Sequence, residues 1–197
     1  MNTLIILDWD DTLFPTSWLA KNKIDLTKQV LIKKYEKYFE YLDKLVYSLL
    51  LKLQQYGKVV IITNAAMLWI EITANVMPNT VKILNNIDVI SAKDKYKKFS
   101  NNIMDWKKIS FLKYMIKYKE SNFKNVISIG DAEYEYEALI SLYKKFNNKN
   151  FKSIKFIKNP EFNILIEQLI GTYKSIKQIS NINNNIDLKF NNRKIEN

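Results

Sequence analysis

The chain has 197 residues, of which 47% are hydrophobic and 26% are charged, a balance typical of one soluble globular domain. It contains no Cys and no His, which excludes disulfides, thiolate or imidazole metal sites, and Ser–His or Cys–His catalytic triads. Three glycines are too few for the Gly-rich loops that bind nucleotide phosphates. The catalytic groups that remain are carboxylates, Lys, Ser/Thr and a cation that prefers oxygen ligands, such as Mg²⁺.

The formal net charge of +11 raises the question of a polyanionic partner. Arg193 is the one Arg among 31 basic residues, and Arg dominates the direct reading of bases and phosphates. We therefore interpret the basicity as background, an interpretation that a contiguous basic face near the active crevice would weaken. The first residues carry no basic leader, and the longest apolar stretch, 59–70, is too short for a bilayer. We expect a soluble cytoplasmic protein with no membrane partner.

Short apolar runs rich in β-branched residues predict strands that are covered on both faces. Four such runs span residues 4–7, 59–62, 87–90 and 126–129, and a less apolar fifth run spans 154–157.

Helical spacing of apolar residues predicts the connections between these strands. The first expected helix is long: its apolar face runs over 31–49, and it ends at Gly57. A second helix over about 66–76 ends before Pro78, and a third has Asp105 as its N-cap. A fourth spans about 133–146, and a fifth follows Pro160.

Alternating strands and helices predict a doubly wound α/β fold: a mainly parallel, five-stranded, Rossmann-like sheet with helices on both faces. We expect residues 1–180 to form a single domain and residues 181–197 to form a polar, Asn-rich tail.

The functional crevice of an open α/β sheet lies beyond the carboxyl ends of its strands. The first predicted strand runs into Asp8-Trp9-Asp10-Asp11-Thr12 and the second into Thr63-Asn64. The fourth runs into Gly130-Asp131, followed by Glu133, Glu135 and Glu137. Acidic side chains gathered at one edge repel one another unless a cation lies among them, so the sequence predicts a Mg²⁺ site there.

Asp8-x-Asp10-x-Thr12 after a strand, Thr63 after the second strand and Gly130-Asp131 after the fourth resemble the motifs of the haloacid dehalogenase superfamily. The resemblance spans residues 4 to about 140. It implies a Mg²⁺-dependent phosphoric monoester hydrolase in which Asp8 attacks phosphorus and forms an aspartyl-phosphate. Asp10 would act as general acid and then as general base. An oxygen of Asp8, the backbone carbonyl of Asp10 and the carboxylate of Asp131 would hold the metal.

The same resemblance assigns the phosphate-binding groups. The Thr63 hydroxyl and the Asn64 backbone N–H would bind the phosphate, and a Lys between the third and fourth strands would neutralise it. Lys107 is preferred for this role over Lys108, and both are preferred over Lys93 and Lys95. Glu135 stands where an outer-shell role at the metal is expected.

The segments between Asp8 and Thr63 and between Thr63 and Lys107 are too short for a full cap domain. The resemblance then implies a capless member that acts on a large or exposed substrate, such as a phosphoprotein or a nucleic-acid end, because no lid closes over a small molecule. Phe14, Trp18 and Leu19 are expected to form the packed underside of a short flap rather than an exposed docking patch.

Structural interpretations compete with each assignment. The Asp8–Thr12 segment would also suit a strand-end turn, Thr63 a helix N-cap, and the three glutamates a helix N-terminus. Two other functions remain open as well: a catalytically weak binding or regulatory module, and a Lys-rich polyanion-binding protein. The sequence does not determine the substrate or the oligomeric state.

Overall fold

The computed structural model describes residues 2–146 and 148–191. Its strands form one six-stranded sheet, ordered β3-β2-β1-β4-β5-β6, in which every neighbouring pair is parallel. The strands are β1 (Thr3–Leu7), β2 (Lys58–Thr63), β3 (Asp88–Ser91), β4 (Asn125–Gly130), β5 (Asn150–Lys155) and β6 (Ile186–Lys189). The predicted parallel α/β fold is confirmed, but the prediction of five strands is wrong.

The sixth strand lies within the segment expected to be a polar tail. Although β6 is largely exposed, Phe190 directly after it packs edge-on against Phe156, with ring centroids 5.3 Å apart. The same ring lies over Gly171, where a Cβ would come within 2.9 Å of it. Pairing with β5, the packing of Ile186 and this aromatic contact therefore hold a strand whose own residues carry little apolar signal.

Strand β5 begins four residues earlier than predicted, because a buried polar position hides its start. The Lys152 side chain is fully buried, and its ammonium donates to the carbonyls of Ile179 (2.7 Å) and Ser180 (3.3 Å), at the end of the last helix. A Lys that satisfies helix C-terminal carbonyls interrupts the apolar run that sequence patterns rely on.

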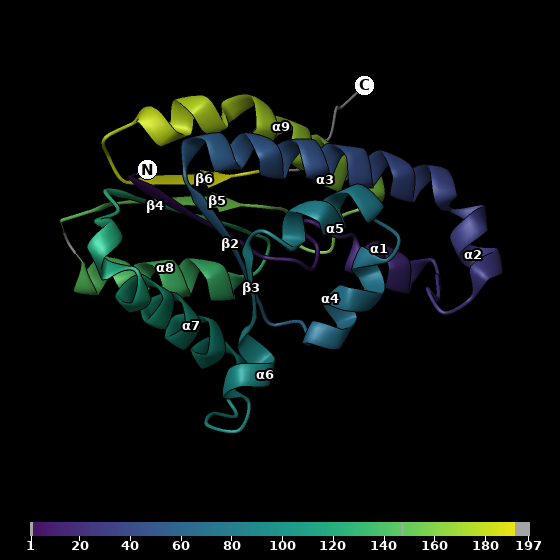
Figure 1. Cartoon of the computed structure of the whole chain (residues 1–197), viewed down its shortest axis with the longest axis horizontal. Coiled ribbons are helices and arrows are strands. Elements are labelled where there is room, and N and C mark those ends of the chain that lie inside the picture. The colour runs from purple at the N-terminus through teal and green to yellow at the C-terminus, as the bar shows by residue number, and fades with distance from the viewer. Residues whose placement is uncertain (1, 147, 192–197) are drawn as a thin grey trace.

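Helices connect the strands and cover both faces of the sheet (Figure 1). They are α1 (Thr16–Lys21), α2 (Gln29–Lys34), α3 (Glu36–Tyr56), α4 (Met67–Ala74), α5 (Pro78–Leu84), α6 (Ala92–Tyr96), α7 (Ile103–Lys117), α8 (Glu133–Lys145) and α9 (Phe162–Asn181), with a 3₁₀ turn at Lys119–Ser121. Helices α3 and α9 lie on one face, and α7 and α8 on the other. No helix in the described parts of the chain has the length and apolarity needed to cross a membrane.

Each central strand contributes to two separate cores, as alternation of side chains requires. Ile5 and Leu7 of β1 belong to the core under α3 and α9, whereas Leu4 and Ile6 belong to the core under α7 and α8. All four are buried, which explains why β1 reads as a continuous apolar run.

The helix predicted over about 66–76 is confirmed as α4, which ends before Pro78. Pro78 itself begins α5, since a first-turn Pro gives up an N–H that has no helical partner. The predicted N-cap of α7 is wrong. Asn102, not Asp105, caps α7 by accepting a hydrogen bond from the Met104 N–H at 3.1 Å. The Asp105 carboxylate instead accepts one from the Ser100 hydroxyl at 2.8 Å.

The segment between β1 and α3 holds only the short helices α1 and α2. Phe14, Trp18 and Leu19 are buried there, so their expected packing role is confirmed. Two side-chain contacts tie α1 to the loop before α9: the Ser17 hydroxyl donates to Asn159 at 3.1 Å, and Lys21 pairs with Glu161.

Candidate metal and phosphate site

Three buried carboxylates meet at the carboxyl edge of the sheet. Asp8 follows β1, and Asp131 follows the neighbouring strand β4. The pairing of these two strands extends as far as Asp8, whose N–H donates to the Ile129 carbonyl at 3.0 Å. Glu135 lies on the first turn of α8, which places its carboxylate beside them. One oxygen from each of the three groups lies within 4.8 Å of the others, so together they could hold a metal ion.

Lys107, from α7, is inserted among these carboxylates. Its side chain has no exposed surface, and its ammonium lies 2.9 Å from Oδ1 of Asp8 and pairs with Glu135. Lys108 instead points to the surface and pairs with Glu137 at 3.4 Å. Of these two lysines, Lys107 is therefore the one that the structure brings to Asp8.

Charge at the cluster does not balance within the protein. With all groups ionised, three carboxylates and one ammonium leave an excess of two negative charges, which one divalent cation would cancel. Burial, reinforced by Asp8 and Glu135, raises the pKa of Asp131 to about 8. Burial also raises the pKa of Glu135 despite the opposing charge of Lys107.

The Lys107 ammonium responds in the opposite way. Burial alone would lower the pKa of Lys107, but the charges of Asp8 and Glu135 outweigh it and raise the pKa above its usual value. The ammonium is thus a permanent positive charge at the cluster.

One oxygen of Asp8, Oδ1, is able to bind a further ligand. Oδ1 is buried, and among the described residues it has one ion-pair partner, the Lys107 ammonium at 2.9 Å. A carboxylate oxygen carries two lone pairs, so Oδ1 can accept a further ligand beside Lys107. The donor set contains only oxygens, which suits a hard cation such as Mg²⁺.

Gly130 makes room for Glu135. A Cβ at position 130 would lie 2.4 Å from Cγ of Glu135, a distance that real atoms do not tolerate. The Glu135 side chain folds back over this glycine, so that Oε2 accepts a hydrogen bond from the Ala132 N–H at 2.9 Å while Oε1 meets Lys107. Glu135 therefore lies among the grouped carboxylates rather than outside them.

Asp10 has a different environment from the three grouped carboxylates. Its Oδ1 accepts hydrogen bonds from the Thr16 hydroxyl and from the Trp69 indole N–H, the latter at 2.8 Å. Burial raises the pKa of Asp10, with a further contribution from the Asp8 charge, although the Thr16 and Trp69 hydrogen bonds oppose the shift. Both donors use one oxygen, which leaves Oδ2 without a hydrogen bond from either.

Asp11 was not singled out by its sequence position. It has a left-handed backbone, φ 51°, which Asp tolerates better than most residues. Its carboxylate accepts hydrogen bonds from the backbone N–H (2.8 Å) and the hydroxyl of Ser17, in the first turn of α1. Asp11 therefore holds α1 against the turn that follows β1, a structural role.

The loop after β2 contributes Thr63 and Asn64. The Thr63 hydroxyl is buried and accepts a hydrogen bond from the Ala65 N–H at 3.0 Å, which leaves its proton available to another acceptor. The Asn64 side chain donates to the Ile103 carbonyl at 3.4 Å. Helix α4 begins only at Met67, so Asn64 lies ahead of the helix rather than at its head.

The other glutamates of α8 lie at the rim. Glu133 pairs with Lys155, and Glu137 pairs with Lys108. Their side chains are 55% and 39% exposed, which supports the structural interpretation of these two residues as part of a solvated, acidic helix start.

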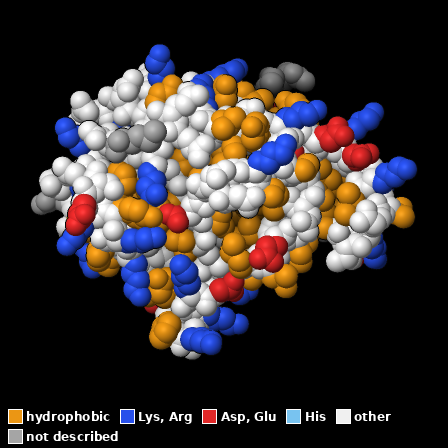
Figure 2. Space-filling view, in the orientation of Figure 1, with side chains coloured by type: hydrophobic (Ala, Val, Ile, Leu, Met, Phe, Trp, Pro, Cys, Tyr) orange, Lys and Arg blue, Asp and Glu red, His pale blue; other side chains and the backbone are white. Residues whose placement is uncertain are grey.

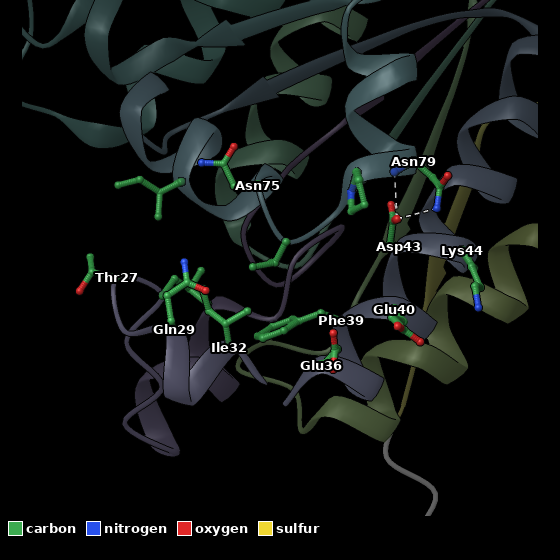
Figure 3. Close-up of a pocket in the computed structure, with 14 residues that line it drawn as sticks. Thr27, Gln29, Ile32, Glu36, Phe39, Glu40, Asp43, Lys44, Asn75 and Asn79 are labelled. Carbon is green, nitrogen blue, oxygen red and sulfur yellow. Dashed lines mark hydrogen bonds between the residues drawn. The ribbon is translucent and has the colours of Figure 1, made fainter. Parts of the chain in front are cut away.

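A separate cavity of about 650 Å³ lies between α2, α3 and α5 and contains none of these residues (Figure 3). Its most buried carboxylate, Asp43, accepts hydrogen bonds from the N–H groups of Asn79 (2.9 Å) and Thr80 (2.7 Å). Asp43 therefore serves as the cap of α5, and its lone pairs face the helix rather than a ligand.

Sequence reasoning missed one residue at the site. No motif of the sequence singles out Trp69, yet it is half-buried and its N–H reaches Asp10. Its position one turn into the helix that follows Thr63 was the only available signal.

Comparisons of the chain with protein-family models, with curated proteins and with solved structures returned no match.

Proposed function

We propose that the protein is a Mg²⁺-dependent phosphatase of the haloacid dehalogenase type, acting on phosphomonoesters. The observation that carries the proposal is the buried group in which Lys107 lies 2.9 Å from Asp8 and beside Glu135, with Asp131 completing three carboxylates. A nucleophile, a neutralising ammonium and an acidic metal site then occupy one edge of the sheet.

The residues at this edge fit Mg²⁺. Asp8, the Asp131 carboxylate and the backbone carbonyl of Asp10 would hold the ion, and Glu135, whose oxygens meet Lys107 and the Ala132 N–H, would orient Lys107 beside it. When bound, Mg²⁺ would reduce the repulsion between an anionic nucleophile and an anionic phosphate.

The chain's own groups would supply the remaining chemistry. An Asp8 oxygen bonds to phosphorus while the bond from phosphorus to the leaving oxygen breaks, and Asp10 gives that oxygen its proton. Asp10 then takes a proton from a water molecule, which attacks phosphorus, breaks the bond to Asp8 and releases phosphate. The Thr63 hydroxyl, the Asn64 N–H and the Lys107 ammonium hold the phosphoryl oxygens throughout.

The length of the flap between β1 and α3 limits the kind of substrate that the site can enclose. Between the Asp8–Thr12 motif and α3 the chain forms only the short helices α1 and α2, and side-chain contacts tie α1 to the loop before α9. With so little chain to close over a small molecule, we propose a large or exposed substrate, such as a phosphoprotein or a nucleic-acid end.

The test is hydrolysis of a generic aryl phosphate by the wild type, by Asp8→Asn and by a matched control, Asp187→Asn, which changes a carboxylate on the exposed strand β6. We expect Mg²⁺-dependent activity that Asp8→Asn abolishes and Asp187→Asn retains. If all three proteins show the same background on this substrate and on phosphorylated peptides and oligonucleotides, the proposal fails, and a binding module becomes the better description.

A further inference from the structure

Residues 92–103 form a lobe that projects from the carboxyl edge of the sheet. The lobe comprises α6 and the loop that leads to the start of α7, and it extends below the body of the molecule in Figure 1. It begins directly after β3, at the edge where the candidate active site lies.

The lobe is joined to the loop after β2 that carries Thr63. The Asp94 carboxylate accepts a hydrogen bond from the Met67 N–H at 2.7 Å, and the Asn64 side chain donates to the Ile103 carbonyl. Ser91, at the base of the lobe, donates to the Ala65 carbonyl at 2.7 Å. A ligand with its phosphate at Thr63 would thus have the lobe immediately beside it.

The charge of the lobe has one dominant sign. It carries Lys93, Lys95, Lys97 and Lys98, and basic side chains gather on it in Figure 2. Within residues 2–146 and 148–191, none of these four ammonium groups has an ion-pair partner, whereas the nearby Asp94 is engaged by the α4 backbone. Four lysines thus lie within six consecutive residues, next to the loop that carries Thr63.

An aromatic ring stands directly beside these lysines. The Phe99 side chain is 80% exposed, an unusual position for a large apolar residue. An isolated protruding ring offers a flat face for stacking rather than a groove for an apolar side chain. Lysines that follow a phosphate backbone, together with an aromatic ring that stacks on a base, are the elements of sequence-independent single-strand binding.

We propose that the lobe binds a single-stranded polynucleotide and presents its terminal phosphate to the active site. This inference rests on the proposed phosphatase function and narrows its substrate class. The lysines neutralise backbone phosphates, and Phe99 stacks on a base. The absence of Arg from the lobe agrees with binding that does not read sequence.

The experiment measures binding of a fluorescein-labelled, 3′-phosphorylated oligothymidylate of about 12 nucleotides, a length within the range of single-strand sites. Fluorescence anisotropy is recorded over a salt series with EDTA present, so that no Mg²⁺-dependent turnover occurs. One variant changes Lys93, Lys95, Lys97 and Lys98 to Gln. Its matched control changes four exposed lysines in the later turns of α8 and α9, Lys144, Lys145, Lys174 and Lys177, to Gln.

We expect the slope of log affinity against log salt to fall by about 3 in the lobe variant, since about 0.7 counterions are released for each single-strand phosphate contact. The control variant should keep nearly the wild-type slope. Equal losses in the two variants would overturn the proposal, because the general basicity of the chain would then explain binding.

Substitution of Phe99 separates a polynucleotide from an acidic protein partner. Phe99→Ala and Phe99→Leu should both weaken binding about tenfold, because stacking requires the ring, whereas Phe99→Tyr should retain it. A Phe99→Leu variant with wild-type affinity, or displacement of the oligonucleotide by an acidic peptide at equal charge concentration, would overturn the proposal in favour of a protein partner. Because binding is measured without turnover, these outcomes are independent of whether the aryl phosphate is hydrolysed.

Discussion

Asp10 shows how hydrogen bonds can assign different tasks to the two oxygens of one carboxyl group. Thr16 and Trp69 both donate to Oδ1, so neither occupies Oδ2. In the proposed reaction Oδ2 is then the oxygen that carries the proton to and from the substrate. Trp69 is a positioning residue in this arrangement, since it acts through Asp10.

Trp69→Phe should impair proton transfer more than binding. An alkyl phosphate needs a proton on its leaving alcohol, whereas an aryl phosphate with an acidic phenol does not. We expect kcat to fall about tenfold or more for the alkyl substrate, with little change in KM, and to fall much less for the aryl substrate. Trp18→Phe, which changes a buried Trp on α1, is the control, and a simple packing defect would slow both substrates equally.

Asp88 provides a test of pH dependence away from the candidate metal site. Its carboxylate accepts a hydrogen bond from the Tyr114 hydroxyl at 2.6 Å and one from Tyr118 at 3.0 Å, and it lies 3.8 Å from the Lys58 ammonium. The Tyr114 hydrogen bond is the main reason that the pKa of Asp88 lies below its ordinary value of 3.8.

A carboxylate with a lowered pKa stabilises the fold above its unfolded pKa and loses this contribution as the pH falls through the folded value. Asp88→Asn should therefore lower the free energy of unfolding near neutral pH, by about 1 kcal/mol or less because the side chain is partly exposed. The difference from wild type should shrink in urea titrations below about pH 4. A difference that stays constant with pH would show that charge on Asp88 contributes nothing.

Among the elements, the junction of β4 and α8 is the least tolerant of change. Gly130 ends the strand, and Glu135 folds back over it, so the strand end and the first turn of the helix share one space. The position of Glu135 relative to Lys107 depends on this close approach.

Gly130→Ala should destabilise the protein by about 1–3 kcal/mol, the usual cost of overpacking a core position. The added methyl group would displace Glu135 and weaken its contacts with Lys107 and the Ala132 N–H. Chemical denaturation measures the cost, and a double-mutant cycle with Glu135→Ala identifies its origin. If the two substitutions are additive, the clash with Glu135 is not the cause.

Strands that are buried on both faces could be predicted from the sequence, whereas exposed or polar strands could not. Strands β1 and β4 are covered on both faces, so their apolar runs identify them directly. Strand β5 was misplaced because Lys152 occupies a buried position, and β6 was missed because it is largely exposed and depends on pairing with β5 and on Phe190, which follows it. Tertiary contacts decide such segments, and local patterns do not record them.

The same limit applies to the site. Asp8 and Asp131 could be assigned to this edge because each directly follows a predicted strand, whereas Lys107 was chosen because its position resembles that of the family's Lys. The inward position of Glu135 depends on the missing Cβ of Gly130, and the role of Trp69 depends on the direction of α4. Neither could be predicted without coordinates.

At the scale of the whole molecule, the excess negative charge of the cluster predicts a link between cation binding and folding. A ligand that binds only the folded chain stabilises it, by about 2.7 kcal/mol at a concentration of 100 Kd. Mg²⁺ should therefore raise the melting temperature of the wild type, and more so than a monovalent salt at equal ionic strength.

Asp131→Asn should remove most of the stabilisation that Mg²⁺ gives to the wild type. At a pH above the raised pKa of Asp131, about 8, the Mg²⁺-free variant should be at least as stable as the wild type, because one of three crowded negative charges is gone, and Mg²⁺ should add little. Asp187→Asn should behave as wild type in both conditions. An equal thermal shift in all three proteins would mean that Mg²⁺ binds elsewhere.

The burial of Lys107 has a consequence for covalent labelling. Reagents that acylate amines need an accessible and uncharged nitrogen, and Lys107 offers neither, since it is fully buried and its pKa is raised. Surface lysines should be modified first, so the chain would lose its basic character before its site is touched. The rate at which Lys107 becomes labelled, read by mass spectrometry, would then report how often the folded chain opens at the carboxyl edge of its sheet.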